Sequence, residues 1–224
     1  KPAEQTPLIA AQGIAILLEA GVPPGVVQLL PGRGETVGAQ LTGDDRVRGV
    51  MFTGSTEVAT LLQRNIASRL DAQGRPIPLI AETGGMNAMI VDSSALTEQV
   101  VVDVLASAFD SAGQRCSALR VLCLQDEIAD HTLKMLRGAM AECRMGNPGR
   151  LTTDIGPVID SEAKANIERH IQTMRSKGRP VFQAVRENSE DAREWQSGTF
   201  VAPTLIELDD FAELQKEVFS PLLH

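Results

Sequence analysis

The sequence predicts an α/β fold in which a doubly wound parallel sheet has helices on both faces. Two observations support this prediction. Short apolar runs of strand length alternate with longer stretches of helix length, and Pro and Gly punctuate them, as at Pro23-Pro24-Gly25 and Pro31-Gly32. Strands separated by helices imply right-handed crossovers and therefore parallel pairing.

The first part of the chain contains the signals for three helices and three strands. Its opening helix has one apolar stripe with a glycine to end it, and its longest helix has hydroxyl residues at the start that can cap it. In order, we expect a helix over 6–20 ended by Gly21, a buried strand over 26–30, a short helix over 35–41, a second buried strand over 49–53, a helix over 55–70 capped by Ser55 or Thr56, and a strand over 78–82.

The same alternation resumes after Gly84-Gly85 and predicts a second α/β unit. We expect strands over 88–91, 120–124 and 200–208, helices over 97–111, 128–143 and 161–177, and a surface loop or hairpin near 188–198. The sequence therefore predicts two domains, residues 1–82 and residues 83–224.

Composition excludes several classes of function. Twenty-one basic against 29 acidic residues give a formal net charge of -8, the wrong sign for binding nucleic acid through phosphates. The longest apolar runs are broken by Glu19 and Asp103, well short of the roughly 20 residues of a membrane span. Three cysteines without a CxxC pair argue against a disulfide framework and a structural metal site. We expect a cytoplasmic protein with no metal and no nucleic-acid or membrane contact from this segment.

The two ends of the sequence suggest a longer parent. The chain opens on Lys1-Pro2 without an initiating methionine and stops at Leu223-His224 without a helix stop signal. We expect both ends to be cut.

Cys116 is the first candidate for chemistry. It lies in Gly113-Gln114-Arg115-Cys116-Ser117, between a predicted helix and a predicted strand, where reactive groups are commonly displayed. Arg115 beside it can favour the thiolate, the form that attacks carbonyls. A lone cysteine is more often a packing residue, and we assign Cys123 and Cys143 to the core.

Three further motifs have both a functional and a structural interpretation. Glu82-Thr83-Gly84-Gly85 puts a carboxylate at a strand end, either as a general base or as an ordinary turn residue. Phe52-Thr53-Gly54-Ser55 runs from strand to helix, which suits a phosphate or merely caps the helix. Gly32-Arg33-Gly34 is a glycine cluster without the GxGxxG spacing.

Taken together and in order, these motifs resemble the aldehyde dehydrogenase superfamily from the first residue to the last. Lys1-Pro2-Ala3-Glu4 is similar to the family's adenosine-ribose segment and Glu217-Val218-Phe219-Ser220-Pro221 to its nicotinamide-ribose segment. The resemblance implies a fragment of that fold, a partial Rossmann-like NAD-binding sheet over 1–82 followed by a partial α/β catalytic domain over 83–224.

The resemblance also implies roles for individual residues. Cys116 would be the nucleophile and Glu82 the general base, with Arg115 and Ser117 at the substrate. The residues implied in NAD binding are Lys1, Glu4, Gly32, Thr53, Gly54, Ser55, Gly84, Glu217 and Phe219.

Within the superfamily, three stretches resemble one particular branch. Residues 51–90, GQRCSALRVL and GPVIDSEAKANIERHI resemble the pyrroline-5-carboxylate dehydrogenases that bacteria join to a flavin-dependent proline dehydrogenase. This implies NAD-dependent oxidation of L-glutamate γ-semialdehyde to L-glutamate, FAD only in the absent part, and a homo-oligomeric parent that is cytoplasmic or peripheral at the inner membrane face. Preference between NAD and NADP stays open.

Three other interpretations remain. The chain can belong to a dehydrogenase branch acting on another aldehyde, or to a non-catalytic module of the same fold. A cysteine hydrolase would need one of three histidines, His131, His170 or His224, as the partner of Cys116.

The sequence departs from the family pattern in two respects. Ser220 stands where the family usually has glycine, which would be costly if the site needs a positive φ. The chain also begins after the family's oxyanion asparagine and ends before its substrate-carboxylate loop and its oligomerisation hairpin, so we expect the isolated chain to be inactive.

Overall fold

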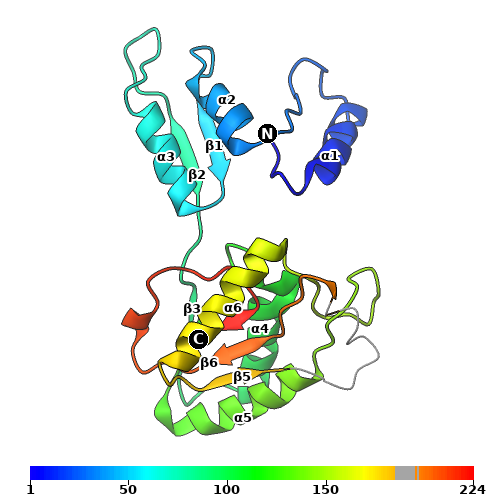
Figure 1. Ribbon diagram of the computed structural model, residues 1–224, viewed down its shortest axis with the longest axis vertical. Coiled ribbons are helices and arrows are strands. Elements are labelled where there is room, and N and C mark those ends of the chain that lie inside the picture. The colour runs from blue at the N-terminus through cyan, green and yellow to red at the C-terminus, as the bar shows by residue number, and fades with distance from the viewer. Residues whose placement is uncertain (185–194, 196) are drawn as a thin grey trace. The chain divides into compact units, whose positions relative to one another are not determined.

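The computed structural model describes residues 1–184, 195 and 197–224, and the chain divides into two compact units, Lys1–Thr83 and Gly84–His224 (Figure 1). Each unit is described by itself. The loop or hairpin predicted near 188–198 lies mostly outside the described residues. The predicted domain boundary falls one residue from this division; the identity of each domain stays a prediction.

The first unit contains a two-stranded parallel sheet, β1 (Val50–Thr53) and β2 (Leu79–Glu82), in which Val50 pairs with Leu79 and Thr53 with Glu82. The helix between the two strands lies beside β2 (Figure 1), the strand-helix-strand order predicted for a parallel pair. The helical elements are α1 (Pro7–Glu19), the π-helical turn η1 (Gly34–Gly38), α2 (Ala39–Gly43) and α3 (Thr56–Ile66).

The predicted helix ends in this unit are partly confirmed. Ser55, with extended backbone, caps α3 through its Oγ, which accepts a hydrogen bond from the Val58 amide at 3.2 Å; the cap is therefore Ser55 and not Thr56. Gly21 follows α1 with φ +93°, as a helix-ending glycine should. However, α3 ends at Ile66, four residues earlier than expected.

Two strand predictions in this unit need correction. No strand forms over 26–30, where Val26 is 71% exposed, and β1 is not buried, because Met51 is 83% exposed. Among the described residues β1 pairs only with β2, so no second strand borders it, and the face that carries Met51 is open.

The second unit contains two groups of strands that backbone hydrogen bonds join. β3 (Ala88–Val91) pairs in parallel with β4 (Val121–Leu124), while β6 (Thr204–Ile206) lies between antiparallel β5 (Val181–Gln183) and parallel β7 (Leu222–Leu223). The Leu122 amide donates to His224 O at 2.8 Å and the His224 amide to Arg120 O at 2.9 Å. The C-terminal segment is thereby fixed beside β4.

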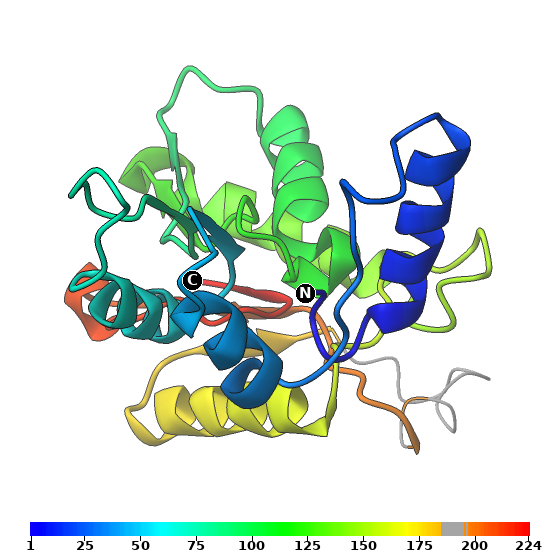
Figure 2. The same cartoon turned by 90° about the horizontal axis from the view of Figure 1, so that it is seen from above.

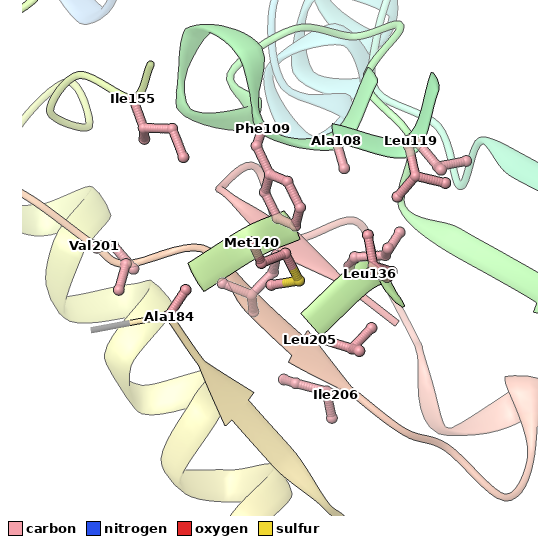
Figure 3. Close-up of a cluster of buried hydrophobic side chains, with 14 of the residues drawn as sticks. Ala108, Phe109, Leu119, Leu136, Met140, Ile155, Ala184, Val201, Leu205 and Ile206 are labelled. Atoms are coloured by element: carbon pink, nitrogen blue, oxygen red, sulfur yellow. The ribbon is translucent and has the colours of Figure 1, made fainter. Parts of the chain in front are cut away.

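Helices pack against these strands and enclose the main core. They are α4 (Thr97–Phe109), α5 (Asp126–Glu142) and α6 (Ser161–Ser176), with short turns η2 (Asp110–Gly113) and η3 (Phe211–Glu213). α6, yellow, lies beside the strand β5 (Figures 1 and 2). Phe109 of α4 and Leu136 and Met140 of α5 are at most 1% exposed and pack in one apolar cluster (Figure 3). Burial of such side chains is the main stabilising contribution to this unit.

Candidate active site

Cys116 lies on the connection between η2 and β4 and is exposed, as predicted. Cys143 is half-buried against the core, also as predicted. The assignment of Cys123 to the core is wrong: Cys123 is exposed, because it shares the uncovered face of the β3–β4 pair with its partner Ile90, which is 83% exposed.

Three side chains hold the backbone around Cys116. The Asn87 amide donates to Cys116 O at 2.7 Å and to Ala118 O at 2.9 Å, and the Arg120 guanidinium donates to Arg115 O at 3.1 Å. Gln114 accepts from the Ile159 amide at 2.8 Å. None of Asn87, Gln114 and Arg120 was predicted as a site residue. The one sequence signal was a charged residue, Arg120, opening an apolar strand.

The turn that leads into the Cys116 loop has an unusual backbone. Ser111, Ala112 and Gly113 all have positive φ, at 55°, 53° and 64°. The left-handed region costs a non-glycine residue roughly 1–2 kcal/mol, and such backbones cluster at functional sites. The helix predicted over 97–111 therefore ends at Phe109, and the chain reverses sharply to display the residues that follow.

Arg115 and Ser117 flank the thiol. Arg115 donates to Ala106 O at 3.1 Å and lies 4.0 Å from the Asp110 carboxylate, with 43% of its side chain exposed. Ser117 is exposed. The effect of Arg115 on the thiolate and the substrate roles of both residues stay predictions.

The segment around Glu217 is fixed by Arg120. Glu217 Oε1 accepts from Arg120 Nε at 2.9 Å and lies 2.8 Å from Nη2, while Nη1 donates to Ser220 O at 3.0 Å. The Arg120 guanidinium carbon lies 5.2 Å from the centre of the Phe219 ring. The Arg120 side chain is 2% exposed, so this charge is buried with its partners. Burial lowers the pKa of Arg120, and the hydrogen bond and charge of Glu217 oppose this.

Ser220 does not require the conformation that glycine would favour. Its φ is not positive, because the only non-glycine residues with positive φ in the described part of the chain are Ser111 and Ala112. Ser220 is fully buried, and its Oγ donates to Val218 O at 3.1 Å. The backbone cost considered for this substitution is therefore absent.

Gly84 leaves the space that Glu217 occupies. A Cβ at Gly84 would lie 1.6 Å from Glu217 Oε2, so any larger residue would displace the carboxylate. Oε2 accepts no hydrogen bond from the residues that the structure describes, whereas Oε1 is paired with Arg120. One carboxylate oxygen thus remains available to a hydroxyl donor.

A cavity of about 610 Å³ adjoins this carboxylate. It lies between α6 and the segment 213–219, and its lining includes Gln114, His170, Glu217 and Phe219. Its volume is in the range of small-molecule sites. A carboxylate that can accept a hydroxyl and an aromatic ring lie at its wall.

In the first unit, two predicted cofactor segments meet. Glu4 Oε1 accepts from the Gly34 amide at 2.7 Å, and the Lys1 side chain lies beside Gly38. Gly32 has φ +145°. The segment Lys1–Glu4 and the glycine loop are therefore adjacent, as a shared ligand would require.

The residues of the strand-to-helix turn are also adjacent. Thr53 pairs with Glu82 in the sheet, and the Gly54 amide donates to Glu82 O at 3.1 Å. Glu82 is exposed at the end of β2, because no described residue of the first unit covers that strand end.

The three histidines do not supply a partner for Cys116. His131 is exposed on α5, and His170 Nε2 lies 2.9 Å from His224 Nε2. Within the described residues no hydrogen bond joins a histidine to Cys116, which disfavours a cysteine hydrolase. No group of three His, Cys, Asp or Glu side chains there is placed to hold a metal, and no helix there is long and apolar enough to span a membrane.

Comparison with known proteins agrees with the motifs. The chain is 99% identical over all 224 residues to the bifunctional protein PutA of Escherichia coli, of which it covers 17%, and 32% identical to the 1-pyrroline-5-carboxylate dehydrogenase of Bacillus cereus, of which it covers 42%. The chain thus spans less than a fifth of the first relative and less than half of the second.

Solved structures give the same result. A crystal structure of Bradyrhizobium japonicum proline utilization A matches with a TM-score of 0.89 at 46% identity, covering 100% of this chain and 22% of that one. A Staphylococcus aureus betaine aldehyde dehydrogenase in complex with NAD+ matches with a TM-score of 0.88 at 29% identity, covering 99% of this chain and 43% of that one. The model of the aldehyde dehydrogenase family matches residues 1–224, and the chain belongs to that family.

Proposed function

We propose that this chain is a fragment of an NAD-dependent dehydrogenase that oxidises L-glutamate γ-semialdehyde, the open form of pyrroline-5-carboxylate, to L-glutamate through a thioester on Cys116. The observation that carries the proposal is an exposed thiol on a backbone loop fixed by Asn87 and Arg120, with the Glu217 carboxylate bound to the same arginine. The relatives named for proline utilization and pyrroline-5-carboxylate oxidation support the choice of substrate.

The first step is attack on the aldehyde. The Cys116 thiolate adds to the carbonyl carbon and forms a tetrahedral thiohemiacetal whose oxygen carries the negative charge. The Cys116 backbone N–H is one donor for this oxyanion. Ser117, the next residue, holds the substrate carboxylate, with Arg115 beside it.

The remaining steps complete the oxidation. When bound, NAD+ would supply the acceptor for the hydride that is lost as the thiohemiacetal collapses to a thioester. Glu82 then takes a proton from water, and the hydroxide released adds to the thioester carbon and displaces the Cys116 thiolate. The products are L-glutamate and the free thiol.

Residues of both units would hold the cofactor. In the first unit these are Lys1, Glu4, Gly32, Thr53, Gly54 and Ser55, and in the second Gly84, Glu217 and Phe219. Glu217 Oε2 would accept a ribose hydroxyl, and Phe219 would lie at the nicotinamide. FAD would belong only to a proline dehydrogenase part outside this chain. The parent protein would be homo-oligomeric and cytoplasmic. The isolated chain would lack activity.

The test uses the full-length bifunctional relative that is 99% identical to this chain over its 224 residues, with residues numbered as here. NADH formation is measured with glutamate semialdehyde for wild type, Cys116→Ala and Glu82→Gln. Cys123→Ala is the matched control, because Cys123 is the other exposed cysteine in the described chain. We expect Cys116→Ala to lose at least about 1,000-fold in kcat, Glu82→Gln to lose steady turnover, and Cys123→Ala to remain at wild type. Activity that survives in Cys116→Ala would refute the nucleophile.

Substrate class is tested on the same protein. Glutamate semialdehyde is compared with an aliphatic aldehyde of equal length and with betaine aldehyde, by kcat/KM. The proposal predicts a preference of at least about 100-fold for the semialdehyde, because its carboxylate needs a charged or hydroxyl partner that the others do not use. Equal kcat/KM values would place the chain in another branch of the family.

A further inference from the structure

Arg120 is the one buried charged side chain among the described residues of the second unit. Its side chain is 2% exposed, and each of its three guanidinium nitrogens has a partner. Those partners come from two separate segments: Arg115 O belongs to the loop that displays Cys116, whereas Glu217 and Ser220 O belong to the segment near the C-terminus. The sequence separations are 5, 97 and 100 residues.

The planar guanidinium is better suited than any other side chain to bind acceptors from two segments at once. It presents five N–H donors in a fixed fork and stays protonated at any working pH, so its three contacts share one rigid geometry. A lysine ammonium in the same place can reach one acceptor but cannot reproduce the fork.

The backbones of the two segments are also in direct contact. Gly113, at the start of the Cys116 loop, packs directly on the Ser220 carbonyl, so that a Cβ there would lie 1.9 Å from the oxygen. The same carbonyl accepts from Arg120 Nη1 at 3.0 Å. A shift of either segment therefore disturbs the other.

We infer that Arg120 is a positioning residue that locks the Cys116 loop to the Glu217–Ser220 segment, and thereby sets the thiol and the ribose-binding carboxylate in one geometry. The inference rests on the proposed function for its catalytic consequence. We call these hydrogen bonds of Arg120 to the two segments the clamp. The clamp is present in the protein without cofactor or substrate.

The test compares Arg120→Met, Arg120→Lys and a matched control in the full-length protein. The control is Arg137→Met, because Arg137 also forms an arginine–carboxylate pair in the second unit, with Glu207, but contacts neither segment. Backbone hydrogen exchange is measured by mass spectrometry without NAD, on peptides covering 111–119, 214–221 and, as a reference for global stability, 167–174 of α6.

In Arg120→Met we expect exchange at 111–119 and 214–221 to quicken at least about tenfold, since the hydrogen bonds to a charged group are lost, with 167–174 unchanged. Arg120→Lys retains the attraction to Glu217 and restores protection at 214–221 but not at 111–119. Arg137→Met changes neither peptide. Equal quickening in all three peptides would show that Arg120 acts only on stability, and unchanged exchange at 111–119 would refute the clamp.

Kinetics supply the second readout. Loss of the clamp should raise KM for NAD+ and lower kcat, each about tenfold, in Arg120→Met. Arg120→Lys should recover KM within about threefold while kcat stays low, because only the contact with Glu217 is restored. A wild-type KM and kcat in Arg120→Met would overturn the inference. Failure of the proposed function is separate: it would appear as wild-type protein inactive toward the semialdehyde, while the exchange result still decides the clamp.

Discussion

Replacing Gly113 with alanine tests the contact that joins the Cys116 loop to the C-terminal segment. Gly113 is buried with φ +64°, and a Cβ there would lie 1.9 Å from Ser220 O and 2.8 Å from Ala108 O. Real Cβ atoms essentially never approach closer than 3.0 Å, so the Ser220 carbonyl must move by about 1 Å.

The cost has three parts. A left-handed alanine costs roughly 1–2 kcal/mol, the overlap with fixed backbone roughly 1–3 kcal/mol, and weakening of the hydrogen bond from Arg120 to Ser220 O about 1 kcal/mol. We expect Gly113→Ala to lower the free energy of unfolding by about 4 kcal/mol.

Gly178→Ala is the matched control, because Gly178 has φ +79° in the same unit with nothing within 4 Å of its Cβ position. It should cost only the left-handed backbone, roughly 1–2 kcal/mol. Both variants are compared by urea unfolding of the purified chain, followed by fluorescence of Trp195, the one tryptophan, whose Nε1 donates to Met145 O at 3.0 Å. Equal losses in the two variants would refute the steric argument.

Two further predictions concern a helix cap and a histidine. Ser55→Ala should destabilise α3 by about 1 kcal/mol through loss of the cap, whereas Thr56→Ala should have little effect; amide hydrogen exchange along α3 measures both, and equal effects would contradict the cap assignment. Burial, and then the charge of His170, lowers the pKa of His224 to about 4, so the unfolded chain binds more protons than the folded one between about pH 4 and 6.5. The free energy of unfolding should therefore fall as pH drops from about 6.5 to 4, by at most about 3 kcal/mol, and His224→Gln should flatten this slope in urea titrations; an unchanged slope would exclude His224 as its source.

Local signals in the sequence predicted most elements of the fold. The alternation of apolar runs and helical stretches located β1–β4 and α3–α6, and Ser55 and Gly21 mark helix ends because caps depend on neighbouring residues only.

Predictions of burial were less successful, because burial depends on what covers a residue. The strand expected over 26–30 lacks a partner strand, and Met51 and Cys123 lie on strand faces that no described element covers. Apolar periodicity shows that a face can be buried but not that a partner is present.

The sequence revealed the site motifs in their order, but it did not reveal the contacts that hold these motifs together. Arg120 meets Glu217 and Ser220 across about a hundred residues of sequence, and nothing in the local pattern indicates such a pairing. The cost expected for Ser220 assumed a positive φ at a position where the family has glycine, and Ser220 does not have a positive φ.

The most direct test of the thioester mechanism is a single-turnover experiment on Glu82→Gln in the full-length protein. Glutamate semialdehyde and NAD+ are mixed with the variant, NADH is followed through the first turnover, and the acid-quenched protein is digested and analysed by mass spectrometry. We expect a burst of about one NADH per site and a glutamyl adduct on the peptide that carries Cys116. An adduct on any other residue, or a burst with no adduct, would contradict this mechanism.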